Sequence, residues 1–197
     1  MANGGAGSAV DSVVSSTVHW VGIRAARLAD AEGIRAIYNH EVLNGTNTFD
    51  IEPRSPAAQQ AWLEDRRGVH AVLVAVPADD GAVLGFASLS PFRARPAYNT
   101  TVESSVYVHL DHRGAGIGRA LLAEVIGRAQ SHGFHTVIAR ISGDNEASVA
   151  LHRSCGFRVI GVETEVARKF GRWLDITVMQ LMLQDWIGPP DAGAITL

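Results

Sequence analysis

A glycine-rich segment between two differently patterned stretches constrains the fold of this chain more than any other feature. Residues 111–119 hold three alternating glycines, and they follow an alternating segment, residues 101–109, that predicts a β-strand. A helix is predicted next, with these residues on one apolar face: Ile117, Leu121, Leu122, Val125, Ile126 and Ala129. Glycines allow close backbone approach, and the free N–H groups of a helix start favour an anion. The segment predicts a phosphate-type site with Arg113 and Arg119 as donors, and a plain glycine turn is the alternative.

Two common nucleotide-binding motifs do not fit this segment. A P-loop requires Lys-Ser or Lys-Thr after its last glycine, where this chain has Arg119 and Ala120. A dinucleotide-binding fingerprint requires G-x-G-x-x-G, and the residue after Gly118 is again Arg119. The predicted strand also follows several other elements instead of opening the chain. ATP-type and dinucleotide ligands are therefore poorly supported.

Composition favours one globular domain. The chain has 197 residues, of which 47% are hydrophobic and 19% charged, and this balance argues against disorder. A net charge of −3 gives no electrostatic reason to expect nucleic acid, so the anion site must be local. No apolar run approaches a membrane span of about 20 residues, and no secretory signal precedes the domain. We expect a cytoplasmic protein without nucleic-acid or membrane partners.

Cysteine and histidine usage points away from disulfide and metal chemistry. Cys155 is the single cysteine, which excludes an internal disulfide and agrees with a reducing compartment. It follows a helix and is interpreted as a buried small hydrophobe, not a nucleophile. His109 and His112 are near each other, but no further ligand cluster completes a metal site. No metal cofactor is expected.

The rest of the chain alternates strands and helices. Strands are predicted at residues 21–25, 69–76, 82–89, 101–109, 135–141, 157–165 and 173–183. Helices are predicted after a cap at Asp30, from Ser55-Pro56 to Gly68, from Ile117 and over residues 146–154. This order implies an α/β fold of mixed α+β type, a twisted mixed sheet of about seven strands with helices on both faces. Residues 1–19 and 187–197 are expected to be flexible tails around a domain at 20–186.

Several strings resemble one enzyme superfamily. Residues 102–118 and 143–148 resemble the GNAT superfamily of acetyl-CoA-dependent N-acetyltransferases, whose phosphate loop, Arg/Gln-x-x-Gly-x-Gly/Ala, is matched by Arg113, Gly116 and Gly118. Four further strings are similar to the phosphinothricin and methionine sulfoximine N-acetyltransferase branch: residues 47–53, 92–98, 101–108 and 169–175. The resemblance covers about Val21 to Leu183, and it implies the GNAT sheet.

The resemblance also implies acetyl-CoA as co-substrate. Its pyrophosphate would lie in the loop formed by Arg113, Gly114, Ala115, Gly116, Ile117, Gly118 and Arg119. Backbone groups of Val106, Tyr107 and Val108 would hold the pantetheine arm and the acetyl carbonyl. Asn145 would hydrogen-bond the same arm. By itself Asn145 also fits a helix N-cap, and the two roles are compatible.

Acetyl transfer to an amine requires a base. An α-amine has a pKa of roughly 8, so most of it is protonated at neutral pH and must lose a proton before it attacks. Glu103 is the candidate, because it lies on a largely covered strand where desolvation should raise the pKa of its carboxyl. The alternative is a glutamate on a solvated strand face. With the resemblance, Glu103 is expected to be the general base, acting directly or through a water.

The leaving thiolate has a second candidate residue. Many superfamily members have Asn-x-x-Ala-x-x-x-Tyr-x-x-x-Gly-Phe, and here Asn145 and Ser148 are followed by His152 and Gly156. Histidine thus replaces tyrosine, as in the phosphinothricin branch. An imidazolium with a pKa near 6.5 can donate a proton to the thiolate. A simply packed or solvated histidine is the alternative.

Substrate residues are the least defined by sequence. Arg93 and Arg95 could clamp a substrate carboxylate, although such residues are more often surface arginines. Phe49 and Tyr98 could line an apolar part of the pocket, although buried aromatics usually belong to the core. The resemblance favours the site role for these arginines, adds substrate contacts from Ser104 and Ser105, and implies a small amino acid of glutamate-analogue or methionine-sulfoximine type.

Two other functions stay open at this point. One is a GNAT enzyme for protein N-termini or polyamines, although the two arginines would repel a polyamine. The other is a catalytically silent acetyl-CoA-binding domain, against which the presence of both Glu103 and His152 argues. A homodimer is expected from the resemblance, with the last strand and residues 170–173 near the interface.

Overall fold

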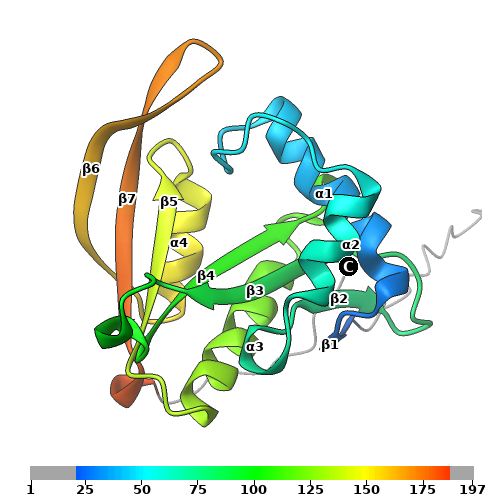
Figure 1. The fold of residues 1–197 in the computed structure, drawn as a ribbon, viewed down its shortest axis with the longest axis horizontal. Helices are drawn as coiled ribbons and strands as arrows, with labels where there is room; N and C mark the ends of the chain where they lie inside the picture. The colour runs from blue at the N-terminus through cyan, green and yellow to red at the C-terminus, as the bar shows by residue number, and fades with distance from the viewer. Residues whose placement is uncertain (1–20, 187–197) are drawn as a thin grey trace, which may run out of the picture.

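A computed structural model gives the architecture of the chain, and the structure describes residues 21–186. The predicted tails, residues 1–19 and 187–197, lie outside the described residues, as does residue 20 of the predicted domain. The described part forms a seven-stranded sheet with α-helices on both faces (Figure 1). The predicted mixed α/β fold is therefore confirmed.

The strands run in the order β1-β2-β3-β4-β5-β7-β6. All neighbouring pairs are antiparallel except β4 and β5, which are parallel. The strands are β1 (Val21–Ala25), β2 (Leu73–Pro77), β3 (Gly85–Pro91), β4 (Thr101–Val108), β5 (Thr136–Ser142), β6 (Arg158–Lys169) and β7 (Arg172–Met182).

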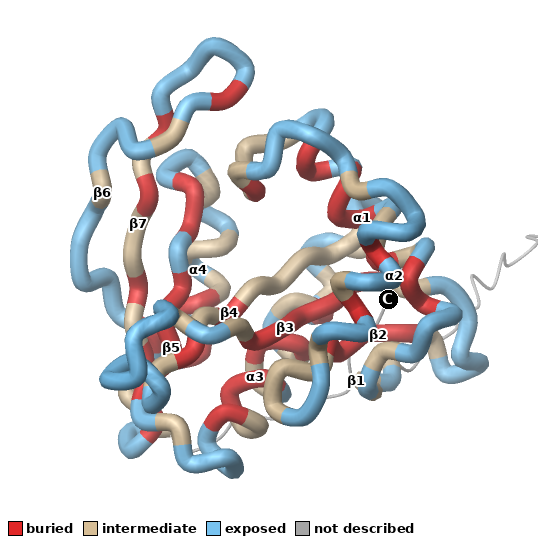
Figure 2. The backbone as a smooth tube through the Cα atoms, in the orientation of Figure 1, coloured by how far each residue is buried: buried red, intermediate tan, exposed pale blue. Residues whose placement is uncertain are grey.

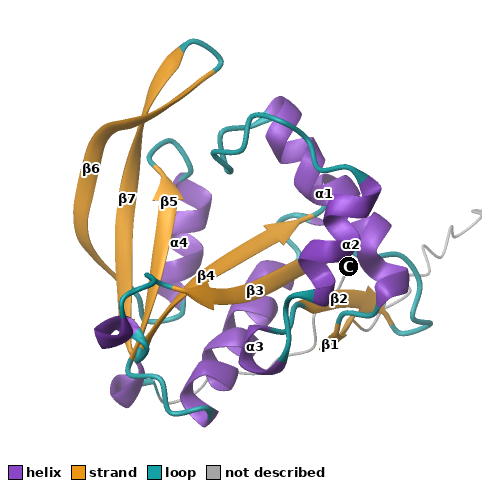
Figure 3. Cartoon of the chain, viewed as in Figure 1, coloured by secondary structure: helices purple, strands orange, loops and turns teal. Residues whose placement is uncertain are grey.

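Four α-helices cover the sheet in the described range (Figure 3). They are α1 (Ala31–Asn44), α2 (Pro56–Glu64), α3 (Ile117–Ser131) and α4 (Glu146–Ser154). One apolar core joins α3 to β2, β3, β4, β5 and β7, and α4 packs on this side too. A second core joins α1 and α2 to alternate residues of β2 and to Phe86 of β3. The six residues predicted for the apolar face of the α3 helix are all buried.

Helix starts follow the predicted capping chemistry in two of three cases. The Ser55 hydroxyl accepts a hydrogen bond from the Ala58 amide at 3.1 Å, with Pro56 in the first helical position. The Asn145 side chain caps α4 in the same way, accepting from the Ser148 amide at 2.9 Å. Asp30 precedes α1, but its side chain makes no cap hydrogen bond, because Arg24 engages its carboxylate.

Several predicted boundaries were wrong where backbone conformation breaks the pattern. The helix predicted to Gly68 ends at Glu64, and Gly68 has φ +59° in a 3₁₀ turn that delays the next strand to Leu73. The strand predicted to end at residue 165 continues to Lys169. It then turns into β7 through Phe170 and Gly171, which both have positive φ, as in tight hairpin turns. β6 is exposed along nearly its whole length (Figure 2).

The sheet opens between its two central strands. β4 and β5 pair over only three residues, Thr101–Glu103 against Thr136–Ile138. Beyond this point β4 continues along β3, while β5 continues along β7 (Figure 1). The glycine-rich loop and α3 follow directly on the diverging end of β4. The divergence therefore places an opening inside the sheet next to the predicted anion site.

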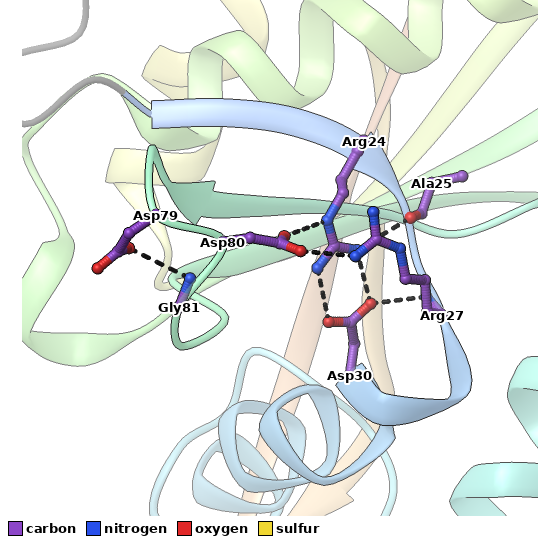
Figure 4. Close-up of polar contacts among 7 residues, drawn as sticks. All are labelled: Arg24, Ala25, Arg27, Asp30, Asp79, Asp80 and Gly81. Atoms are coloured by element: carbon purple, nitrogen blue, oxygen red, sulfur yellow. Dashed lines mark hydrogen bonds and ion pairs between the residues drawn. The ribbon is translucent and has the colours of Figure 1, made fainter.

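A network of ion pairs lies at the β1 edge of the sheet, away from the β4–β5 opening (Figure 4). The Arg24 guanidinium of β1 donates to Asp30 at 2.7 and 2.9 Å and to Asp80, in the β2–β3 turn, at 2.6 Å. Arg27 adds its backbone amide to Asp30 at 2.6 Å and its guanidinium to Asp80 at 2.5 Å. Hydrogen bonds from Arg24 lower the pKa of the Asp30 carboxyl. The network joins β1, the β2–β3 turn and the start of α1.

Candidate active site

A cavity of about 510 Å³ occupies the opening between β4 and β5. Side chains alternate along a strand, so neighbouring positions project to opposite faces of the sheet. Ser104 and Val106 of β4, with Ala139 of β5, line the cavity on the α3 side, whereas Ser105 and Arg140 line it on the α1 side. The cavity therefore passes through the sheet, and two reactants can reach it from opposite faces.

The glycine-rich loop forms one end of this cavity. Gly114 and Gly116 have φ +81° and +83°, a conformation that side-chain-bearing residues rarely adopt, and Gly116 is the N-cap of α3. A Cβ on Gly118 would lie 3.3 Å from Leu151 and 3.4 Å from Val108, so glycine allows α3 to approach α4 and β4. The free N–H groups of the first turn of α3 thus meet the cavity, as an anion site requires.

Most residues predicted to bind the cofactor line the cavity. They are Val106, Tyr107, Val108, Arg113, Gly114, Gly116, Ile117, Gly118, Arg119 and Asn145. Ala115 is the exception, because its side chain packs against the apolar core on the α3 side. The residues chosen from the sequence pattern therefore form the cavity wall made by the end of β4, the glycine-rich loop and the start of α3.

Two further cavity residues come from the end of α1 and were not predicted. Glu41 is buried and forms an ion pair with Arg113, while Asn47 donates to Glu41 at 2.5 Å. The Asn145 side chain in turn donates to Asn47 at 2.7 Å. One sequence signal was available: Glu41 lies seven residues after Ile34, on the apolar stripe of its helix. A buried carboxylate on an apolar stripe requires a charged partner, and here the partner is the loop arginine.

The hairpin formed by β6 and β7 is tied to the same region. Lys169 is buried, and its Nζ donates to the backbone oxygens of Glu41 at 3.2 Å and Thr48 at 2.9 Å. Burial lowers the pKa of Lys169. Asp144, before α4, accepts from Thr46 at 3.0 Å and pairs with Arg172 at 3.4 Å. These contacts hold the loop after α1 between the hairpin and the start of α4.

Glu103 lies at the base of the opening, as the last β4 residue that pairs with β5. Burial raises the pKa of its carboxyl; the Arg140 guanidinium opposes this rise and the Glu163 carboxylate adds to it. Arg140 and Glu163 form an ion pair with each other. Within residues 21–186 the Glu103 carboxylate accepts no hydrogen bond. The half-buried position and the raised pKa are those expected for a general base, and they disfavour a fully solvated glutamate.

His152 is buried on the α4 side of the cavity. Its Nδ1 lies 2.8 Å from the carbonyl oxygen of Ser148, which can only accept, so Nδ1 carries the proton. Its Nε2 has no hydrogen-bond partner among the described residues. Burial lowers the pKa of this imidazole, so the ring is mostly neutral at pH 7. An ordinary imidazole with a pKa near 6.5, as expected from the sequence, would be partly charged at this pH, whereas the buried ring of His152 is not.

The predicted substrate residues divide into two groups. Ser104 and Ser105 line the cavity, whereas Glu103, which was also predicted to contact the substrate, is not among its lining residues. Arg93, Arg95 and Tyr98 are exposed on the loop before β4, and Phe49 is half-buried; none of these four lines the cavity. The Arg93 guanidinium instead lies 5.0 Å from the Phe92 ring centre and 5.7 Å from that of Tyr98.

Other chemistry finds no site in the described part of the chain. Cys155 is buried, and burial raises the pKa of its thiol, in agreement with a packing role. Among residues 21–186 no cluster of three or more His, Cys, Asp or Glu side chains is placed to hold a metal ion. None of the helices in that range has the length and apolar character needed to cross a membrane.

Comparison with known families identifies the loop and the strands around it. Residues 34–157, which include the glycine loop, Glu103 and His152, match the acetyltransferase (GNAT) family. The chain belongs to the GNAT acetyltransferase family. The chain is therefore an acetyl-CoA-dependent N-acetyltransferase.

Individual relatives of this GNAT chain are similar over most of their length. An L-methionine sulfoximine/L-methionine sulfone acetyltransferase of Pseudomonas aeruginosa is 46% identical, over 82% of this chain and 94% of its own. A phosphinothricin N-acetyltransferase of Streptomyces coelicolor is 40% identical, over 75% of this chain and 87% of its own. A solved structure, a GNAT phosphinothricin acetyltransferase from Sinorhizobium meliloti in complex with AcCoA, superposes with TM-score 0.80 and 39% identity, covering 88% and 95% of the two chains.

Proposed function

We propose that this enzyme acetylates the α-amine of small amino-acid analogues of the methionine sulfoximine, methionine sulfone and phosphinothricin type. The relatives named for these substrates support the substrate class. The observation that carries the proposal is the cavity through the sheet, with the phosphate loop at one end and Ser104 and Ser105 in its wall, directly after Glu103, the last β4 residue paired with β5. This arrangement lets the cofactor and the amine enter from opposite faces.

The residues present fit coenzyme A. Free N–H groups at the start of α3, with Arg113 and Arg119 beside them, suit a pyrophosphate. Val106, Tyr107 and Val108 lie beyond the last β4–β5 pair and line the opening, and backbone groups of this stretch would bind the amide-rich pantetheine arm and the acetyl carbonyl. Asn145 would use its side-chain amide on the same arm. When bound, acetyl-CoA supplies the activated acetyl thioester.

The proton steps follow from the two titratable side chains. The reaction forms an amide N–C bond and breaks the thioester C–S bond, while the amine nitrogen loses a proton and the sulfur gains one. Glu103 takes the amine proton, directly or through one water, and its raised pKa matches this task better than that of an ordinary carboxylate. Ser148 holds the Nδ1 proton of His152, so the neutral ring has only a buried lone pair at Nε2. His152 can therefore give a proton to the leaving sulfur only after Nε2 has taken one up from water, and Glu103 returns the amine proton to water to complete the cycle.

Direct turnover assays test the substrate class. Purified enzyme is incubated with acetyl-CoA and, separately, methionine sulfone, methionine sulfoximine and phosphinothricin, with free thiol and acetylated product measured together. Spermidine and a short peptide with a free N-terminus serve as comparison amines. We expect acetylation of at least one amino-acid analogue, with higher kcat/KM than either comparison amine. Acetylation of none of the three would contradict the proposed substrates.

We also propose that the enzyme works as a cytoplasmic homodimer. β6 is an edge strand with exposed apolar side chains, Val159, Ile160, Val162 and Val166, and Phe170 and Trp173 are exposed at the turn into β7 and just beyond it. Such an edge is ordinarily covered in a stable protein, which supports a second copy there. Sedimentation equilibrium of the full chain tests this, and a single monomeric species at micromolar concentration would contradict it.

A further inference from the structure

We infer that Arg140 binds the α-carboxylate of the acceptor amino acid and thereby selects amino acids over other amines. The inference rests on the proposed function, since it names the group that would recognise its substrate. Arg140 is on β5, lines the cavity, and stays partly accessible, with 37% of its side chain exposed.

The geometry of an α-amino acid sets where its carboxylate must lie. Amine and carboxylate are attached to the same carbon, so the cation that binds the carboxylate must lie next to the base that receives the amine proton. Glu103 pairs with Ile138 across the parallel strands, and Arg140 is two residues beyond Ile138, on the same face of β5. The guanidinium is close enough to lower the pKa of Glu103 against the effect of burial.

The charges around Arg140 complement a zwitterion. Arg140 donates one NH₂ group to Glu163, and its planar fork of five N–H donors can hold a second carboxylate. Glu103 and Glu163 present negative charge on either side of it. An amino acid placed there sets its ammonium towards the carboxylates and its carboxylate towards Arg140. An amine without a carboxylate can interact with Glu103 and Glu163 but not with Arg140.

The other described cationic side chains near the cavity have different roles or positions. Arg113 and Arg119 belong to the phosphate loop, and Arg113 also pairs with Glu41. Lys169 is buried and donates to two backbone carbonyls. Arg93 and Arg95, which the family resemblance favoured as the carboxylate clamp, are exposed and line no part of the cavity. Arg140 is thus the arginine that lines the cavity on the α1 side, together with Ser105, and Glu103 projects from β4 on the same face of the sheet.

A substrate pair isolates the carboxylate contact. Methionine sulfone is compared with 3-(methylsulfonyl)propylamine, which lacks only the carboxylate, in wild type, Arg140→Gln and a surface control, Arg158→Gln. For Arg140→Gln we expect kcat/KM for methionine sulfone to fall about 10- to 100-fold, mainly through KM, as loss of a charge-assisted hydrogen bond predicts. Turnover of the propylamine should fall far less, because it loses only the effect of Arg140 on the pKa of Glu103, and KM for acetyl-CoA should be unchanged. Arg158→Gln should match wild type with both substrates.

The alternatives give different results. An equal loss with both substrates would show that Arg140 only supports the fold and would overturn the inference. A selective loss in Arg93→Gln or Arg95→Gln, with Arg140→Gln unaffected, would assign the carboxylate to the loop arginines. Calorimetry of methionine sulfone binding to the CoA-saturated enzyme separates the two proposals. If methionine sulfone binds to wild type but not to Arg140→Gln, and wild type does not acetylate it, the carboxylate contact of Arg140 stands and the proposed substrate class is wrong. If methionine sulfone binds to neither protein, both proposals are wrong.

Discussion

Two clusters of arginines and carboxylates, one at the β1 edge of the sheet and one at its central opening, behave differently. At β1, Arg24 and Arg27 face Asp30 and Asp80, and each carboxylate accepts hydrogen bonds from both arginines (Figure 4). At the β4–β5 opening a single arginine, Arg140, serves two carboxylates, those of Glu103 and Glu163, and it pairs with only one of them. We call the first cluster balanced, because it has as many arginines as carboxylates, and the second unbalanced, because it has one arginine for two carboxylates.

The carboxyl pKa values follow this difference. Hydrogen bonds from Arg24 lower the pKa of Asp30, whereas burial without a hydrogen-bond partner raises that of Glu103. A balanced cluster fixes its carboxylates in the charged form, so it can hold elements together but cannot exchange protons near neutral pH. An unbalanced cluster beside a cavity leaves one carboxylate able to take up a proton. This contrast separates a structural cluster from a candidate catalytic one.

The largest expected effect is that of Glu103→Gln. Without the base, kcat should fall by about 10²- to 10⁴-fold, the usual contribution of general-base catalysis. In wild type the rate should fall as the pH falls through the raised pKa of Glu103, because the protonated carboxyl cannot accept a proton, and the variant should lose this limb. Steady-state kinetics from pH 5 to 9 measure both effects. Glu124→Gln, an exposed carboxylate on α3, is the control; near-normal kcat of Glu103→Gln across this range would contradict the assignment.

Asp30→Asn should affect stability and leave catalysis unchanged. We expect a loss of about 1–3 kcal/mol in the free energy of unfolding at pH 7, because the variant weakens charged hydrogen bonds. Since the folded-state pKa of Asp30 is lowered, its contribution is present above the unfolded pKa of about 3.9 and is lost as the pH falls through the folded value. Urea unfolding at pH 7 and pH 3 measures the difference between variant and wild type, which should shrink in acid.

A matched control for Asp30 lies in the neighbouring turn. Asp79 is outside the network and accepts only a 3.3 Å hydrogen bond from the Gly81 amide (Figure 4). Asp79→Asn should therefore leave the unfolding free energy close to that of wild type. If Asp79→Asn and Asp30→Asn cost the same, the balanced network has no special role in stability.

His152→Gln should have a smaller effect on rate than Glu103→Gln, about tenfold in kcat, because a thiol with a pKa of roughly 8.5 leaves without strong assistance. The lowered pKa of the His152 imidazole also affects the stability of the wild-type protein. The neutral ring contributes above the unfolded pKa of about 6.5, and this contribution is lost as the pH falls through the folded value. Kinetics at pH 7 with urea unfolding at pH 7 and pH 5 test both effects. An unchanged kcat would show that His152 only packs against Phe157.

The smallest effect is expected for Arg27→Gln. Arg27 is the most exposed member of the balanced cluster, with 62% of its side chain accessible, and exposed ion pairs contribute little in water. Its loss should cost less stability than Asp30→Asn, because Arg24 still engages both carboxylates. Thermal unfolding at low and high salt measures it. A cost equal to that of Asp30→Asn would show that the cluster acts as one cooperative unit.

Local sequence signals explain how much of the fold was predictable. The apolar stripe from Ile117 to Ala129 and the Ser55-Pro56 helix start depend on residues close in the chain, and the structure confirms both. The ends of β2 and β6 depend on the positive φ values of Gly68 and Phe170, which periodicity does not reveal. Periodicity alone does not show the opening between β4 and β5 either, because alternation assigns side chains to a face but not strands to neighbours; the family resemblance is what implied it.

The candidate site divides in the same way. The glycine loop and Asn145 are read from short spacings, and they do lie together at the cavity. Glu41, Asn47 and Arg140 come from segments far apart in the chain and meet only through tertiary packing, so no local pattern joins them to the loop. For His152 the spacing gave the position, but its lowered pKa comes from the packing around α4.

The three-residue junction between β4 and β5 links the stability of the protein to ligand binding. The two halves of the sheet share few backbone hydrogen bonds, so the enzyme without ligand lacks pairing that other sheets possess. A ligand that binds along the opening supplies this pairing only to the folded chain. At a concentration 100 times its dissociation constant it adds about 2.7 kcal/mol to stability. The unfolding temperature of the protein should therefore rise with the concentration of acetyl-CoA.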